Sequence, residues 1–283
     1  MNNLGFSLNI FHDLATMLQY GFMRHALEAG TVVAIVAGII GYFVVLRHSS
    51  FAAHGLAHAG FTGAAGAVLL GLSPILGLFA FTLGGALLMA SLGKRAASRD
   101  VEIGTVLAFM LGVGILFIAL YKGGYATEAY SILFGEILGI STADVWVTVI
   151  ASAAVLLVFF LIYRPLLFAS LDEDVAEARG ISISKIGAAF LLLVAAATSV
   201  AVQVVGVLLI FSLMVTPAAV AHRIARRPAR GIFISVLIAL LATWIGLFIS
   251  FYIPYPVSFF ITAITFVVYI LFRLKPITAA NAN

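Results

Sequence analysis

Residues 51–60 read Phe51-Ala52-Ala53-His54-Gly55-Leu56-Ala57-His58-Ala59-Gly60, a small and apolar segment whose only titratable side chains are two histidines. The rest of the chain is of the same kind, because 64% of its 283 residues are hydrophobic and 9% are charged. So few polar side chains could not cover a water-facing surface. The segment is therefore predicted to be a membrane-spanning helix of an all-α, polytopic integral membrane protein.

The two histidines are spaced to act together. His54 and His58 are four residues apart, so on a helix their imidazoles share one face. Histidine is the commonest metal ligand, and an ionisable residue inside a membrane span indicates a functional site. The pair is a candidate metal site; the alternative is that both rings hydrogen-bond to neighbouring helices and only fix packing. The chain has no cysteine, so nitrogen and oxygen must supply any other ligands.

Apolar stretches near the roughly 20 residues needed to cross a bilayer recur along the chain. They predict about nine spans, with eight as the alternative, in one domain covering residues 1–283. No fixed-period repeat or long linker divides the chain. The expected spans are 25–46, 51–72, 75–93, 103–121, 144–163, 184–200, 203–222, 231–252 and 256–272, with residues 1–20 as an interfacial N-terminal helix.

The basic residues indicate the orientation. If Arg47 is cytoplasmic and the spans alternate, thirteen of the 15 lysines and arginines are cytoplasmic, and only Arg24 and Lys122 are outside. The positive-inside rule then predicts that the N-terminus is outside and the C-terminus inside. No basic run suggests binding to nucleic acid.

Four further features carry weaker signals. Gly60 lies among small residues that let helices pack closely and that could also leave room for an ion. Thr216-Pro217 predicts a kink or an end in its helix, because proline lacks a backbone donor. Glu128 and Glu136, in the longest outer connection, are candidates for gathering cations at the outer mouth; ordinary solvated loop charge is the alternative.

Segment 166–182 holds the densest acidic cluster of the chain. Acidic residues come first and arginine and glycine follow, a pattern typical of a short capped helix aligned with its own dipole. Such a polar helix between two spans is either a solvated turn or a docking site. Its residues of interest are Asp172, Glu173, Asp174, Ala176, Glu177, Arg179 and Gly180.

Four short pieces follow one another across most of the chain. They are Phe22-Met23-Arg24-His25-Ala26-Leu27, then Gly41-Tyr42-Phe43-Val44-Val45-Leu46-Arg47 leading into Ala57-His58-Ala59, then Asp172 to Gly180, and then Val205-Gly206-Val207-Leu208-Leu209 through Val215-Thr216-Pro217-Ala218-Ala219. In this order they resemble the permease subunit of bacterial ABC importers for zinc and manganese.

The resemblance implies roles and partners. Segment 166–182 would be the coupling segment that seats in a separate cytoplasmic ATPase subunit, and two permeases would form a homodimer in the bacterial cytoplasmic (inner) membrane. An extracytoplasmic metal-binding protein would deliver the ion. His58 falls on the histidine of the family's translocation pathway, whereas His54 stands where such importers usually carry aspartate.

The chemistry of the pair favours zinc, with manganese next. Two copies of His54 and His58 could supply four imidazoles, which suit tetrahedral zinc, whereas manganese prefers oxygen. The sequence has no Gly-x-x-x-x-Gly-Lys-Ser/Thr loop, so ATP would be hydrolysed by the partner and the chain is not itself an enzyme. No permanently bound cofactor is expected.

Two other functions remain to be compared with this one. A stand-alone secondary transporter or channel would carry the same cargo and need no docking segment. An intramembrane metalloenzyme is disfavoured, because the sequence has no His-Glu-x-x-His motif.

Overall fold

The structure is a computed structural model that describes residues 10–92, 99–121 and 135–274. In these ranges every regular element is a helix, so the all-α prediction is confirmed. The elements are α1 (Ile10–Gln19), α2 (Gly21–Leu46), α3 (Ser50–Leu69), α4 (Pro74–Leu92), α5 (Arg99–Leu120), η1 (Ile137–Gly139), α7 (Thr142–Leu171), α8 (Glu173–Ala178), α9 (Ile183–Val205), α10 (Val207–Ile224), α11 (Pro228–Tyr252) and α12 (Val257–Leu274).

Eight helices of the described residues are long and apolar enough to cross a membrane: α2, α4, α5, α7, α9, α10, α11 and α12. The long helix outside this set is α3, whose 20 residues are mostly Gly, Ala and other small or polar types. The number of spans is therefore nine if α3 also crosses the membrane and eight if it does not. That α3 crosses the membrane stays a prediction. "Outer" and "cytoplasmic" below refer to the orientation expected from the basic residues.

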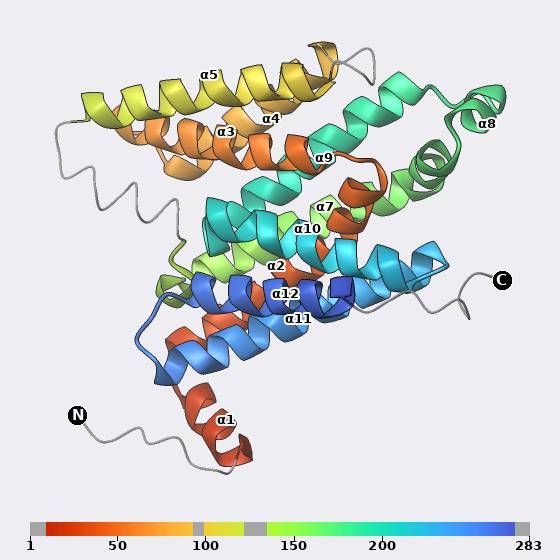
Figure 1. Cartoon of the computed structure of the whole chain (residues 1–283). Helices are drawn as coiled ribbons and strands as arrows, with labels where there is room; N and C mark the ends of the chain where they lie inside the picture. Colours follow the sequence, from red (N-terminus) through yellow and green to blue (C-terminus); the bar gives the residue numbers. More distant parts are fainter. Residues whose placement is uncertain (1–9, 93–98, 122–134, 275–283) are drawn as a thin grey trace.

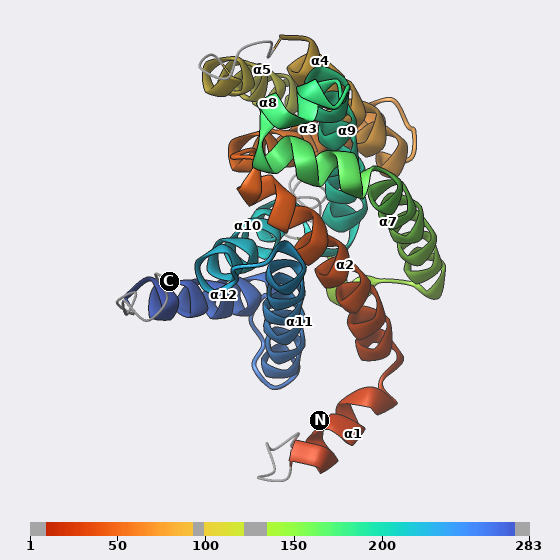
Figure 2. The same cartoon turned by 90° about the vertical axis from the view of Figure 1, so that its right-hand side faces the viewer.

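Helix α2 runs through the middle of the bundle, and glycines set its distance from its neighbours (Figure 2). A Cβ on Gly38 would come within 2.6 Å of the backbone of Val236 in α11. Gly41 likewise faces the backbone of Met214 in α10. These two helices can therefore pack backbone to backbone on α2, as small residues permit in membranes.

Helices α3, α4 and α5 form a second group at one side of the bundle (Figure 1). Gly63 of α3 and Gly77 of α4 face each other so closely that a Cβ on either would meet the other's carbonyl. Gly66 of α3 packs on the ring of Phe117 in α5. The small residues of α3 thus serve close packing against α4 and α5.

The boundary between α9 and α10 differs from the expected break near residues 200–203. Helix α9 continues to Val205, and the chain turns at Gly206, whose φ of 81° suits glycine. Helix α10 then runs through the buried Pro217 without ending there. Of the two outcomes predicted for Thr216-Pro217, the helix end is therefore wrong.

The N-terminal helix α1 projects from the bundle beside the start of α2 (Figure 2). Its Asp13 and Met17 are buried, whereas Leu14 and Leu18 are exposed. This two-sided pattern agrees with a helix at the edge of the bundle, and its interfacial position remains a prediction.

Candidate functional site

His54 and His58 lie side by side on α3, as the sequence predicts. Their ring centroids are 4.6 Å apart and their planes are nearly perpendicular, at 84°. The Nδ1 atom of each ring is buried and has no hydrogen-bond partner among the described residues. A buried polar atom without a partner costs about 1 to 3 kcal/mol, so these two nitrogens are not explained by hydrogen bonds that fix packing.

The two rings occupy the one open strip of an otherwise enclosed helix. Between Ala52 and Ala67 every residue is buried except His54 and His58, which are half-buried. Helices α4, α5, α9 and α10 cover the other sides of α3. The imidazoles therefore border the boundary of this single chain, where an ion or a second protein could reach them.

Phe211 of α10 closes one side of the pair. Its ring centroid is 4.9 Å from that of His54, and the planes meet at 66°. Sequence reasoning missed this residue, because nothing local marks one phenylalanine among the 23 of the chain. Its position against α3 is set by helix packing alone.

Two other histidines show what a packing histidine looks like here. His25 has Nδ1 3.2 Å from the carbonyl oxygen of Ile140 and Nε2 3.2 Å from the hydroxyl of Thr142. The Nε2 atom of His222 lies 2.9 Å from the carbonyl oxygen of Tyr42, and the imidazole stacks on the Tyr42 ring. The polar contacts of these rings tie helices together, which the unpartnered Nδ1 atoms of the α3 pair do not do.

The predicted short helix of the cytoplasmic segment is present as α8, at one extremity of the molecule (Figure 1). The carboxylate of Asp172 accepts a hydrogen bond of 3.0 Å from the backbone N–H of Val175, and Gly180 ends the turn with φ of 79°. Ala176 is fully buried and anchors the helix. The remaining acidic residues and Arg179 are exposed, and Arg179 lies over the ring of Phe168.

A cavity of about 510 Å³ connects α8 with the cytoplasmic end of α3. Glu173 and Glu177 of α8 line it together with Arg47 and His48, which precede α3, and with Glu102 of α5. The acidic helix is thus placed next to the base of the helix that carries the histidine pair.

Comparison with known proteins decides the family. The ABC 3 transport family matches residues 19–275. The chain belongs to the ABC 3 transport family. The relationship inferred from its sequence motifs is thereby confirmed, and the chain is a multi-pass protein of the bacterial cell membrane and a transport subunit rather than an enzyme.

Relatives of this ABC 3 protein match over most of their length. The manganese transport system membrane protein MntC of Listeria innocua is 30% identical over 239 residues, covering 84% of this chain and 85% of the relative. The manganese import system permease protein ScaB of Streptococcus parasanguinis is 31% identical over 234 residues, covering 82% and 83%. The solved structure of PsaBC from Streptococcus pneumoniae in complex with Fab is 28% identical, with a TM-score of 0.84, covering 97% of this chain and 100% of that chain.

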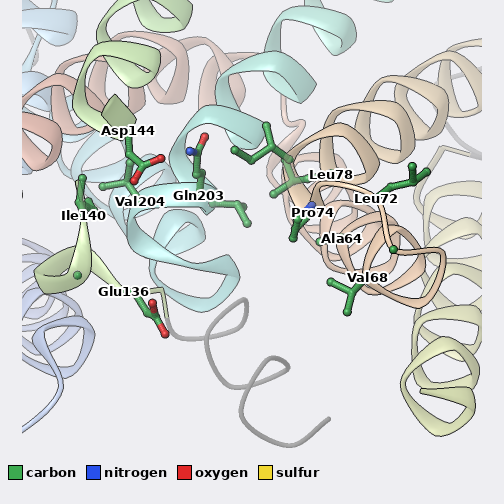
Figure 3. A pocket seen from close by; sticks show the side chains of 14 residues that line it. Ala64, Val68, Leu72, Pro74, Leu78, Glu136, Ile140, Asp144, Gln203 and Val204 are labelled. Atoms are coloured by element: carbon green, nitrogen blue, oxygen red, sulfur yellow. The ribbon is translucent and has the colours of Figure 1, made fainter. Parts of the chain in front are cut away.

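The ABC 3 protein has an acidic cavity on its outer side, shown in Figure 3. Its volume is about 670 Å³, and it lies between the α3–α4 turn, η1 and the ends of α7 and α9. Glu136 lines it together with Asp144 and Gln203, and the role of Glu136 at an outer mouth stays a prediction. Asp144 and Gln203 were not predicted, although each is a polar residue at the end of an apolar span. Glu128 lies outside the described residues.

The remaining predicted residues, Gly60, Thr216 and Pro217, are not placed against the two imidazole rings by any described contact. A Cβ on Gly60 would lie 3.0 Å from the methyl group of Thr82 in α4, so this glycine faces the α3–α4 contact. Pro217 is buried within α10 and Thr216 is half-buried. Within the described residues, no group of three or more His, Asp or Glu side chains could hold a metal ion. The described part of one chain thus brings together two adjacent imidazoles without a third ligand of these types.

Proposed function

We propose that this chain is the membrane-spanning permease subunit of an ATP-driven ABC importer for divalent transition metal ions. Zinc is favoured and manganese is next, and the ion passes along a path between two copies of the chain. The observation that carries the proposal is the pair of adjacent imidazoles in an enclosed helix, each with a buried Nδ1 that has no partner among the described residues.

The ligand chemistry supports zinc. A bare cation entering a low-dielectric medium loses hydration worth on the order of tens of kcal/mol, so ligands must replace its water. Imidazole nitrogen binds zinc more tightly than manganese, which prefers carboxylate and water oxygen. The relatives named above are manganese systems, and His54 stands where the resemblance leads us to expect aspartate. We attribute a shift toward zinc to this difference.

The need for more ligands supports a homodimer. Tetrahedral zinc takes four ligands, and one chain supplies two imidazoles. The half-buried rings of His54 and His58 border the boundary of the chain, so a second copy related by a two-fold axis could complete the set. Release then requires that the four nitrogens meet in only one state of the transport cycle.

The cytoplasmic helix supports coupling to an ATPase. Helix α8 is exposed and capped, and it adjoins a cavity that reaches the base of α3. Movement imposed on α8 by a nucleotide-dependent partner could therefore reach the helix that carries the ligands. On the outer side, the cavity with Glu136, Asp144 and Gln203 would receive cations from an extracytoplasmic binding protein.

The test is ion uptake by the permease reconstituted with its ATPase. We expect ATP-dependent zinc uptake, inhibited more strongly by competing zinc than by competing manganese. His54→Asp restores the oxygen ligand and should raise manganese uptake relative to zinc. If the wild-type complex preferred manganese and His54→Asp left the ratio unchanged, the assignment of zinc to this site would be wrong.

The same assay separates the importer from a stand-alone transporter or channel. An importer loses uptake when ATP is omitted or when residues 172–180 are replaced by a neutral linker of equal length. A gradient-driven transporter keeps its flux in both cases. Flux that survives both changes would therefore overturn the proposed coupling.

A further inference from the structure

A groove runs along the surface of the described chain where α2, α7 and α11 meet, near their outer ends. Its volume is about 900 Å³, and most of its lining is apolar. At its outer end lie the charged side chains of Arg24 and Glu28, and along its sides lie Trp146 and Trp244. None of its lining residues lies on α3 or α10, the helices that carry His54, His58 and Phe211.

The tryptophans mark the depth of the groove. The chain has only two tryptophans, and both line this groove. Trp146 of α7 is 63% exposed and Trp244 of α11 is 44% exposed. The indole N–H of Trp244 donates a hydrogen bond of 2.9 Å to the hydroxyl of Thr31 in α2, which holds this ring against α2. Amphipathic indole rings favour the headgroup level of a bilayer.

The length of α2 places the charged pair at the same level. Its 26 residues correspond to about 39 Å, which exceeds a hydrocarbon core of about 30 Å. Arg24 and Glu28 follow Gly21 by three and seven residues, or about 4.5 and 10.5 Å along the axis, and their long side chains lean toward the N-terminal end of the helix, so their charged ends reach the headgroup region. They are one turn apart on one face of the helix. Next to them, His25 fixes α2 to the start of α7 through Ile140 and Thr142, which holds two walls of the groove in place.

We propose that this groove binds a phospholipid with a primary ammonium headgroup, such as phosphatidylethanolamine, from the outer leaflet. Arg24 binds the phosphate, and Glu28 accepts hydrogen bonds from the ammonium group. One acyl chain lies along the apolar wall of Val145 and Val149 between the two indole rings. A cation and a carboxylate one turn apart match the charges of a zwitterionic headgroup, and the bilayer itself supplies the ligand.

Tryptophan fluorescence provides a direct assay, because both fluorophores of the full chain line the groove. The purified permease is titrated in detergent micelles with phospholipids that carry dibrominated acyl chains, which quench tryptophan on contact. Phosphatidylethanolamine, phosphatidylcholine and phosphatidylglycerol are compared at equal mole fractions. We expect saturable quenching by the ethanolamine lipid at a mole fraction about five- to ten-fold lower than for the other two.

Isosteric variants test the two charges separately. Glu28→Gln should abolish the preference for the ethanolamine lipid, and Arg24→Gln should weaken quenching by all three lipids. Glu102→Gln and Arg273→Gln, which alter the same residue types outside the groove, should change neither. Quenching that is equal for the three headgroups, or unaffected by Glu28→Gln and Arg24→Gln, would show bulk lipid contact only and overturn the proposal.

Discussion

Removal of the imidazoles of α3 should abolish zinc binding without destabilising the metal-free protein. A structural zinc site with four ligands has an apparent binding free energy of about 10–16 kcal/mol, or roughly 3 kcal/mol for each ligand. In a two-fold dimer, His58→Ala removes two ligands at once. The expected loss is therefore about 6 kcal/mol, or roughly 10⁴-fold in affinity. The same estimate applies to His54→Ala.

The metal-free protein should respond differently. The Nδ1 atoms of His54 and His58 are buried without a hydrogen-bond partner among the described residues, so deleting either ring removes an unfavourable group as well as apolar contacts. We expect little change in the thermal midpoint of the metal-free variants. His222→Ala is the matched control, because it breaks a bond to Tyr42 and a stacked contact. It should lower the midpoint and leave zinc binding intact.

Calorimetric titration of the purified permease with zinc measures the affinity, and the midpoint shift at saturating zinc checks it independently. In the wild type and in His222→Ala, zinc should raise the midpoint; in His54→Ala and His58→Ala it should not. If zinc bound the variant that carries both His54→Ala and His58→Ala as tightly as the wild type, the site assignment would be refuted. If His54→Ala and His58→Ala lowered the midpoint of the metal-free protein and left zinc binding intact, as expected of His222→Ala, both rings would be packing residues.

Three further predictions follow from the same contacts. Zinc affinity should fall as the pH is lowered in a calorimetric pH series, because imidazole must be neutral to bind metal and protons compete for its nitrogens; a pH-independent affinity would exclude histidine ligands. Gly63→Ala should lower the thermal midpoint, because its Cβ meets the carbonyl of Gly77, whereas Gly84→Ala, with no neighbour within 4 Å, should leave it unchanged or raise it; equal effects would contradict the close α3–α4 crossing. Asp172→Ala should cost the short α8 helix about 1 kcal/mol and reduce ATP-coupled uptake, whereas Asp174→Ala removes the same charge without the cap bond and should have a smaller effect; equal losses in uptake assays would argue for charge rather than helix order.

Helix α8 could be predicted from the sequence because the interactions that begin and end it are local. A carboxylate in the capping position and a glycine that can adopt positive φ act within a few residues of each other, so no distant contact is needed to predict them. The spans were readable for a similar reason, because hydropathy integrates over about 20 residues. The turn at Gly206 could not be predicted, because the chain has 26 glycines and the packing of the helices determines at which of them the chain turns.

Contacts between distant segments could not be predicted at all. Phe211 meets His54 across 157 positions of sequence, and the two tryptophans reach one groove from α7 and α11. Asp144 and Gln203 were visible only as polar residues that end spans, and the cavity they share with Glu136 exists because three outer segments converge. The sequence supplies such side chains one at a time; helix packing decides which of them become neighbours.

The composition of α3 links the packing of the bundle to its proposed function. Two imidazoles make this helix less apolar than its neighbours, and small residues reduce its hydropathy further. The same small residues let α4 approach until backbone meets backbone, at Gly63 and Gly77, and let the ring of Phe117 in α5 pack on Gly66. Close neighbours then cover α3 between Ala52 and Ala67 on every side except the strip of His54 and His58, which a second copy of the chain would close. A more apolar α3 with larger side chains would insert more readily, but it would hold its neighbours apart and lose the enclosure that a desolvated ion requires.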